Sequence, residues 1–545
     1  MSVFIGYPSF MAYQMMKGKK GNNDGFPSIP GMIARYSALG LTNEQMKENP
    51  VWVDKTGNGH DLQMKNFAWS GMSGVGGYVE NYNRWTKSAV RADITFTDHS
   101  FNVTSVKINQ AQFYYQSSGG EQPFTVPSGT VIVKGLTDGQ VLEYIYTDIE
   151  GRHVFTVKND GIYTLPSFEF IAKGAYYGFQ FNKVQESCNI TIEQLPLYPG
   201  ALVFDGVDDY GTCDNFPILT KGKGYTVVAL RSYLAKSIGY LVYNGTSAKQ
   251  SAFAFERSDS LDTWSWGKNS SIRNLLPKLM SYQTSNSYNN NPISTGEVVE
   301  SNNIINVAYG GGYCNVAIWE IVILDHDATE EELTKIKDYF VKTYPWLFPD
   351  QAWTVVGKTN EDEDRATIAN ITGNGNDLVL SNFGFAEGSG YNEEGEYAGY
   401  LVTDGVDDKA VSKQFKFGEN FTVILDFKFP VKKISYCGFD LSSKVRIQNL
   451  QGSGVNVVLK GNKTLIPSNV VRAVTSDGKV YDENWNEYNI VPGNISSNYT
   501  MVNLGFDGSN QFAEFATKLA GIYSSALSKD DCIKAYNYLQ TLKAK

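Results

Sequence analysis

The stretch Ala-Leu-Val-Phe-Asp-Gly-Val-Asp-Asp-Tyr-Gly-Thr-Cys at residues 201–213 places three carboxylates, those of Asp205, Asp208 and Asp209, within five positions. Clustered hard oxygen ligands of this kind suit calcium. An Asp-Gly pair between two apolar runs is also typical of a tight turn, because glycine accepts a positive φ and aspartate bonds its own backbone. The sequence leaves both interpretations open and favours the turn.

This stretch has a twin, because residues 400–408 read YLVTDGVDD. Two further pairs of segments accompany it. DKTGNGHDLQMKNF at 54–67 matches NITGNGNDLVLSNF at 370–383, and ILDHDATEEELTKIKDYF at 323–340 corresponds to IYSSALSKDDCIKAYNYL at 522–539. The order is the same in both halves, which indicates a duplicated unit. We call the two copies repeat one and repeat two.

Repeat one contains an insertion. Its glycine-rich and acidic turns are separated by 149 residues, from Thr56 to Asp205, against 32 residues from Thr372 to Asp404 in repeat two. The extra segment has apolar-rich runs such as VKINQAQFYY and GTVIVKGL between turn residues, which predicts a small β-sandwich.

Each repeat ends in a predicted short helix, because Thr329 and Ser528 each stand three residues before a carboxylate, as N-caps do. The sequence therefore predicts four parts: a docking peptide at 1–29, a discontinuous first domain at 30–85 and 198–347, an inserted domain at 86–197, and a second domain at 348–545.

The order and wording of these motifs resemble those of laminin-G-like domains, in the family of concanavalin A-like lectins and glucanases. The matching motifs are the TGNGxDL turn, the ALxFDGVDDY strand and turn, and a closing strand that leads into a short helix. The resemblance implies an all-β chain of two concanavalin A-like jelly-roll sandwiches, the first interrupted by the smaller inserted sandwich, each ending in a short helix. Such sandwiches serve binding, catalysis and architecture alike.

Some members of that family bind calcium, which makes the acidic turns candidate sites for a structural ion. Many members also carry an Asp-Glu pair at the start of the final strand, where repeat one has Trp319-Glu320 and repeat two has Lys518-Leu519. The resemblance therefore implies that repeat one is the better calcium candidate, and we expect no other cofactor. The candidate ligands are Asp205, Asp208, Asp209 and Glu320.

The composition argues against two classes of partner. The net charge is −10, and no basic stretch is longer than Lys17-Gly-Lys19-Lys20, so we expect no nucleic acid partner. No run reaches the roughly 18 apolar residues of a membrane helix, so we expect no membrane insertion. The five cysteines are scattered and odd in number, which predicts buried thiols.

Motifs for catalysis are lacking in the sequence. The glucanase branch of the family places its acids as E-x-D-x-x-E on one strand, so that alternate side chains reach the cleft. No such string occurs, and the densest acidic run, Glu361–Asp364, is typical of a solvated loop. We therefore predict that the chain is not an enzyme, with a glycan hydrolase as the least favoured alternative.

Carbohydrate binding is predicted on five aromatic residues in turn-rich stretches, because sugars stack on exposed rings. For each of them packing in a core or interface is the alternative, since large rings dominate both. The candidates are Trp69, Tyr82, Trp85, Trp264 and Trp266.

Lectin-like domains without a secretion signal are typical of a virion protein, made in the host cytoplasm and released by lysis. The style of the chain also resembles structural or fibre proteins of tailed phages of gut Bacteroidales. We therefore predict a head decoration, collar or tail fibre protein, oligomeric on the particle, that displays lectin-like domains to host or mucosal glycans. Residues 1–29 would dock on other virion proteins or, alternatively, complete the first sandwich as a strand. The rival prediction is a bacterial surface carbohydrate-binding protein.

Overall fold

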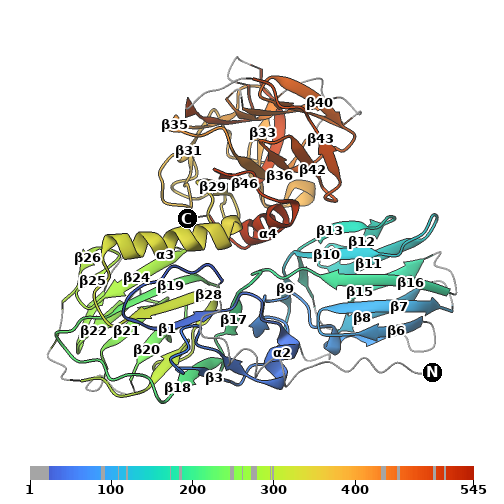
Figure 1. Ribbon diagram of the computed structural model, residues 1–545. Helices are drawn as coiled ribbons and strands as arrows, with labels where there is room; N and C mark the ends of the chain where they lie inside the picture. The colour runs from blue at the N-terminus through green and yellow to red at the C-terminus, as the bar shows by residue number, and fades with distance from the viewer. Residues whose placement is uncertain are drawn as a thin grey trace. The chain divides into compact units, whose positions relative to one another are not determined.

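The computed structural model describes residues 24–544, and Figure 1 shows an all-β chain of antiparallel sheets, as the sequence predicts. Residues 1–23 of the predicted docking peptide lie outside the described residues. The internal gaps are 88–91, 108–109, 118–120, 172–173, 183–186, 246–250, 261, 272–278, 295, 297–299, 431–436, 443, 451–453, 495–498 and 508–510. By compactness the chain divides into one unit up to Gly77 with Tyr198–Thr343, and another of Tyr78–Leu197 with Tyr344–Lys545.

Repeat one forms a sandwich of two eight-stranded sheets. The first sheet runs β26 (Asn291–Pro292), β25 (Ser287–Tyr288), β24 (Met280–Thr284), β19 (Thr226–Tyr233), β28 (Asn315–Leu324), β17 (Leu202–Asp205), β4 (Gly74–Val75), with β1 (Met32–Ser37) also paired to β28. The second runs β2 (Val51–Trp52), β3 (Leu62–Lys65), β18 (Tyr210–Cys213), β27 (Ile305–Val307), β20 (Tyr240–Asn244), β21 (Phe253–Arg257), β22 (Asp262–Ser265), β23 (Lys268–Ser271).

Repeat two forms a second sandwich with the same strand order. One sheet runs β32 (Gly390–Asn392), β33 (Tyr400–Asp404), β46 (Glu514–Tyr523), β36 (Thr422–Lys428), β41 (Val471–Thr475), β42 (Lys479–Asp482), β43 (Glu487–Asn489), with β29 (Gln351–Thr354) also paired to β46. The other runs β30 (Thr367–Ile368), β31 (Leu378–Ser381), β34 (Lys409–Ser412), β45 (Val502–Leu504), β37 (Cys437–Leu441), β38 (Val445–Leu450), β39 (Gly454–Leu459), β40 (Asn462–Ile466). A separate pair joins β35 (Phe415–Lys416) to β44 (Tyr499–Thr500).

The inserted segment has sheets of its own. One runs β13 (Gly161–Leu165), β10 (Gly129–Lys134), β16 (Ser187–Gln194), β7 (Ser100–Val106), β6 (Ala92–Phe96). The other runs β12 (Gly151–Val157), β11 (Val141–Asp148), β15 (Tyr176–Asn182), β8 (Ala111–Gln116), β5 (Thr86–Lys87), and β14 (Phe168–Phe170) pairs with β9 (Phe124–Val126). Its buried rings and branched side chains form a core that contains Tyr82, Trp85 and Phe113.

The two repeats also agree in local detail. β19 and β36 each have a register shift, after Leu230 and after Asp426 respectively. The Thr226 hydroxyl donates to the carbonyl of His326, and the Thr422 hydroxyl donates to that of Ser525, both at 2.7 Å. Equivalent positions in the two sandwiches can therefore be compared residue by residue.

Short helices follow the closing strands, as predicted. α3 (Glu330–Thr343) follows Thr329, whose hydroxyl accepts the N–H of Glu332 at 3.3 Å. α4 (Lys529–Gln540) follows the N-cap Ser528, whose hydroxyl accepts the N–H of Asp531 at 3.1 Å. The remaining α-helix of the described residues is α2 (Asn43–Glu48), and no described helix is long and apolar enough to cross a membrane.

The cysteines are free thiols. Cys213, Cys314, Cys437 and Cys532 are buried as predicted, whereas Cys188 is half-buried.

Candidate functional site

The acidic stretch of repeat one forms a tight turn between β17 and β18. The Asp205 carboxylate accepts the backbone N–H groups of Val207 and Asp208 at 2.8 and 3.4 Å, and the Asp209 carboxylate accepts that of Asp205 at 3.0 Å. Gly206 has a φ of +76°, in the left-handed region that glycine adopts most easily. The predicted turn is confirmed.

Repeat two builds the same turn between β33 and β34. Asp404 accepts the N–H groups of Val406 and Asp407 at 2.8 and 3.3 Å, Asp408 accepts that of Asp404 at 2.9 Å, and Gly405 has a φ of +72°. The sequence motif DGVDD is therefore a structural turn in both repeats.

Calcium at these turns stays a prediction. In each turn one oxygen from each of the three aspartates lies within 4.8 Å of the others. Calcium requires six to eight oxygen ligands, however, and these carboxylates already accept hydrogen bonds from the turn itself. Asp209 also accepts the Ser73 hydroxyl at 3.0 Å, and burial raises the pKa of Asp209 to about 7. Because the two turns are alike, their geometry gives no reason to prefer repeat one.

Glu320 is not part of the acidic cluster, which corrects the predicted ligand set. It is fully buried on β28, and its two carboxylate oxygens accept Nε and Nη2 of Arg35 at 3.1 and 3.3 Å. Arg35 also donates to the hydroxyl of Tyr339 on α3 at 2.9 Å and pairs with Asp24 at 2.8 Å. Arg35, held by Glu320, therefore joins the closing helix to the sheet beneath it.

The five aromatic residues predicted to bind carbohydrate are buried, so the alternative of packing in a core or interface holds and the exposure that sugar stacking needs is not found. Trp69 and Trp266 belong to the core of the first sandwich, and Tyr82 and Trp85 to that of the inserted segment. Turn-rich flanking sequence did not expose them, because the rings fold back onto apolar neighbours such as Phe67, which stacks on Trp69 at 4.5 Å. The exposed fractions are 7% for Trp69, 1% for Tyr82, 6% for Trp85, 8% for Trp264 and 2% for Trp266.

A different set of rings lies on the outer side of β18, β20 and the β27–β28 connection. We call it the tyrosine platform. Its members are half-buried or exposed, and none belongs to the core between the sheets. They are Tyr210, Tyr240, Tyr243, Tyr309 and Tyr313.

The rings of the platform are mutually close. Tyr309 lies between Tyr210 and Tyr313, with centroids at 5.2 and 5.3 Å, and Tyr309 is 36% exposed. Tyr240 and Tyr243 stack at 5.9 Å with an interplanar angle of 17°. Together these contacts hold the rings in a single surface rather than as isolated side chains.

Gly310 joins the two groups of rings. A Cβ at this position would lie 3.1 Å from Cδ2 of Tyr240 and 3.2 Å from Cγ of Tyr243. The connection between Tyr309 and Tyr313 can therefore pack directly on these rings at Gly310.

Polar groups flank the rings along the sheet. In the register of the sheet, Tyr243 is paired with Asn306, Asn306 with Thr212, and Thr212 with Gln63. On the other side Tyr243 is paired with the small Ala254, and the Trp264 ring lies beyond it, 6.5 Å from the Tyr243 ring. Trp264 is thus the predicted residue that lies beside the platform.

The second sandwich has a different surface at these positions. Asp440 occupies the position of Tyr243, and Arg446, in place of Ala254, pairs with Asp440 at 3.4 Å. At the corner, Lys409 replaces Tyr210, and its Nζ lies 5.5 Å from the Phe506 ring centroid. The extended platform is therefore a feature of the first sandwich.

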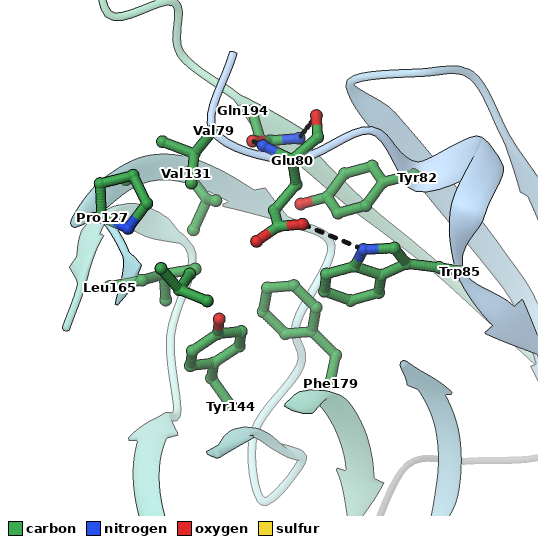
Figure 2. Close-up of a pocket in the computed structure, with 12 residues that line it drawn as sticks. Val79, Glu80, Tyr82, Trp85, Pro127, Val131, Tyr144, Leu165, Phe179 and Gln194 are labelled. Atoms are coloured by element: carbon green, nitrogen blue, oxygen red, sulfur yellow. Dashed lines mark hydrogen bonds between the residues drawn. The ribbon is translucent and has the colours of Figure 1, made fainter. Parts of the chain in front are cut away.

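The inserted segment contains a pocket around Glu80 (Figure 2). The carboxylate accepts Nε1 of Trp85 at 3.2 Å and the hydroxyl of Tyr177 at 3.0 Å, and burial raises the pKa of Glu80 to about 7. Gln194 bonds both the N–H and the carbonyl of Glu80, at 2.9 and 3.0 Å. The free space is about 10 Å³, room for about one water molecule, so the pocket as it stands admits no sugar ring.

Sequence reasoning missed the tyrosine platform, although two signals were present. The run Tyr309-Gly-Gly-Gly-Tyr313 indicates a tight connection between two rings. Tyr210 and Tyr243 are aromatic, whereas their counterparts in repeat two, Lys409 and Asp440, are charged. The aromatic residues in turn-rich stretches are buried. The half-exposed rings lie instead on strands and on one glycine-rich connection.

No protein-family model and no curated protein matches the chain. Solved structures that it matches include the Trypanosoma rangeli sialidase, at 8% identity over 82% of this chain and 61% of that one, with a TM-score of 0.26. The binding domain of Paraclostridial Mosquitocidal Protein 1 matches at 14% identity over 35% of this chain and 52% of that one, with a TM-score of 0.23. The tandem CBM22-1-CBM22-2 domain of Paenibacillus barcinonensis Xyn10C matches at 10% identity over 49% of this chain and 96% of that one, with a TM-score of 0.15.

These matches correct one prediction. The sequence predicted that the chain is not an enzyme, and the matched structures include sialidases, so that exclusion is withdrawn. The chain spans about 61% of the first sialidase and 52% of the mosquitocidal binding domain. At these identities the likeness concerns the β-rich fold alone, and it assigns no activity to this chain.

Proposed function

We propose that the first sandwich binds a neutral glycan on its tyrosine platform. The observation that carries the proposal is the grouping of five half-buried or exposed tyrosine rings on one side of a sheet, at centroid distances of 5.2–6.3 Å. The faces of such rings carry partial negative charge, which attracts the C–H groups of a pyranose ring, and the hydroxyls supply hydrogen bonds at the edges.

The choice of a neutral ligand rests on charge. Arg257, whose guanidinium lies 5.7 Å from the Tyr240 ring, is already paired with Asp259 at 2.6 Å. Its charge is therefore neutralised where a ligand would lie. We expect the affinity to change little between 50 and 500 mM salt, because the contacts are apolar and hydrogen-bonded rather than ionic.

The experiment is a glycan array followed by calorimetry on the glycan that binds. The variant Tyr240→Ala/Tyr243→Ala should abolish that binding. The matched control is Tyr114→Ala/Tyr176→Ala, which removes a half-buried ring pair of similar spacing, 5.5 Å, from the inserted segment. Wild-type affinity in the platform variant, or loss of affinity in the control, overturns the proposal.

We further propose, on the sequence resemblance alone, that this chain is a virion protein which displays its sandwiches on a particle. Mass spectrometry of purified particles tests this role. Absence of the chain from purified particles would contradict the virion role. Recovery of the chain from a bacterial surface would support the rival prediction.

A further inference from the structure

A buried ion pair joins the two sheets of the first sandwich. Arg231 on β19 donates Nε and Nη2 to the carboxylate of Glu256 on β21, at 2.9 and 2.8 Å, and its exposed fraction is 2%. The hydroxyls of Tyr233 and Tyr288 also donate to that carboxylate, the first at 2.9 Å. Glu256 is thereby held by three side chains inside the sandwich.

A second polar group lies nearby in the same interior. Gln283 on β24 donates to the Tyr225 hydroxyl at 2.6 Å and to the backbone carbonyl of Trp264 at 2.9 Å. The Tyr225 hydroxyl donates in turn to Ser265 at 2.9 Å. These contacts attach the backbone of β22 to the opposite sheet.

The fold itself does not require this network. The equivalent positions of the second sandwich, matched through strand pairing, are apolar in five of six cases. They are Phe421 for Tyr225, Phe427 for Arg231, Phe429 for Tyr233, Leu459 for Ser265 and Val474 for Gln283, and Gln448 for Glu256 by counting one residue along the strand from the matched Ile447 and Phe255.

The network is also costly. Charges removed from water lose hydration that their mutual attraction only partly offsets, and apolar residues of similar volume are often as stable or more so. Glu256 in addition has a φ of +51°, a left-handed conformation that is unfavourable for a residue with a Cβ. Since the second sandwich has apolar residues at most of these positions, the fold alone does not account for the network.

The network holds strands that adjoin the tyrosine platform. Glu256 is followed in β21 by Arg257, whose guanidinium lies over the Tyr240 ring. Gln283 holds the carbonyl of Trp264, whose ring lies beside that of Tyr243. β21 and β22 are therefore held by the buried polar groups and contact the platform rings of β20 through Arg257 and Trp264.

A third connection reaches the far rings. The Ser258 hydroxyl, two residues after Glu256, donates to the carbonyls of Ala235 and Ser237 at 3.1 and 3.3 Å. The following Gly239 packs so closely on Tyr313 that a Cβ there would lie 2.5 Å from its carbonyl carbon. The end of β21 is thus connected to the Tyr240–Tyr243 rings through Arg257 and to Tyr313 through the segment from Ala235 to Gly239.

We propose that Arg231, Glu256 and Gln283 are positioning residues of the tyrosine platform. They hold the backbones of β21 and β22 so that the rings are arranged for the ligand before it binds, which avoids the entropic cost of ordering them on binding. This inference rests on the proposed glycan binding at the same surface.

The test replaces the ion pair by the residues of the second sandwich, in the variant Arg231→Phe/Tyr233→Phe/Glu256→Gln. We expect the melting temperature to be equal to or above that of the wild type, and the glycan Kd to be about tenfold weaker. Stability and affinity then move in opposite directions, which loss of a merely structural contact would not produce. Wild-type affinity in this folded variant overturns the inference.

A second variant keeps the test decisive if the triple variant does not fold. Arg231→Lys retains the charge but not the two-pronged contact with Glu256. We expect a weaker Kd and a change in the tyrosine near-ultraviolet circular dichroism, and wild-type values of both overturn the inference. The two proposals fail separately. If Tyr240→Ala/Tyr243→Ala binds normally, the glycan site is wrong, whereas if only the positioning variants bind normally, the positioning role is wrong.

Discussion

Glu320 of the first sandwich and Asp426 of the second place a buried carboxylate at the same site of the fold. They do so from different strands of the equivalent pairs β19–β28 and β36–β46. Glu320 on β28 is paired with Leu230 on β19, whereas Asp426 on β36 is paired with Leu519 on β46. Each carboxylate binds an arginine beneath the closing helix. Repeat two has thus not lost the acid that is missing from Lys518-Leu519, because the neighbouring strand provides it.

The two carboxylates should differ in their importance for stability. Asp426→Asn leaves Arg472 without the carboxylate that it contacts at 2.5 Å, and should lower the free energy of unfolding by about 3 kcal/mol. Glu320→Gln should cost less, because Arg35 keeps its ion pair with Asp24. Urea unfolding monitored by tryptophan fluorescence measures both. A larger loss in Glu320→Gln would contradict this view of the two sites.

Acid should weaken the second sandwich through Asp426. Although burial opposes ionisation, Arg472 and Lys518 lower the pKa of Asp426 to about 2, below its usual value of 3.8. The group therefore stabilises the folded state above about pH 4, and this contribution of about 2 kcal/mol is lost as the pH falls towards 2. In Asp426→Asn the loss of stability between pH 4 and 2 should be correspondingly smaller. An unchanged slope there would exclude Asp426 as its source.

The inserted segment should lose stability as the pH rises through neutrality, whereas the second sandwich loses it as the pH falls. Burial raises the pKa of Glu80 to about 7 from 4.5, so the folded state keeps the proton more tightly than the unfolded one. Its contribution is complete below pH 4.5 and declines by about 3 kcal/mol as the pH rises through 7. Glu80→Gln should remove this decline, measured as the difference from the wild type, whereas Glu169→Gln on the exposed edge of β14 should retain it.

Much of the fold could be predicted because the duplicated sequence contains the same turn motif twice. The Asp-Gly turns and the helix caps depend on contacts between neighbours in sequence, so short motifs are enough to predict them. The tyrosine platform joins residues from Tyr210 to Tyr313, the Glu320–Arg35 pair joins residues 285 positions apart, and sequence alone does not show which side of a strand is covered. Trp264 illustrates the limit, since the sequence identified its ring but left exposure and burial open.

Gly206 should be less tolerant of substitution than a glycine with nearly the same backbone. Gly206 has a φ of +76°, and a Cβ there would lie 2.7 Å from Cβ of Asn315. Gly57 has a φ of +78° with no atom within 4 Å of such a Cβ. Gly57→Ala should therefore cost about 1 kcal/mol of stability from backbone strain alone, and Gly206→Ala about 1–2 kcal/mol more. Equal losses in urea unfolding would show that the contact with Asn315 relaxes freely.

The acidic turns provide the last prediction, which concerns calcium. Asp205 and Asp209 direct their carboxylate oxygens to N–H and hydroxyl groups of the folded chain, so an ion would have to compete with bonds that already stabilise the turn. We expect the melting temperature to be unchanged on adding millimolar calcium or EDTA. The informative control is Asp208→Asn, because Asp208 is exposed and its carboxylate is not needed for the turn. A calcium-dependent rise in the melting temperature that Asp208→Asn removes would show that the turn of repeat one is an ion site after all.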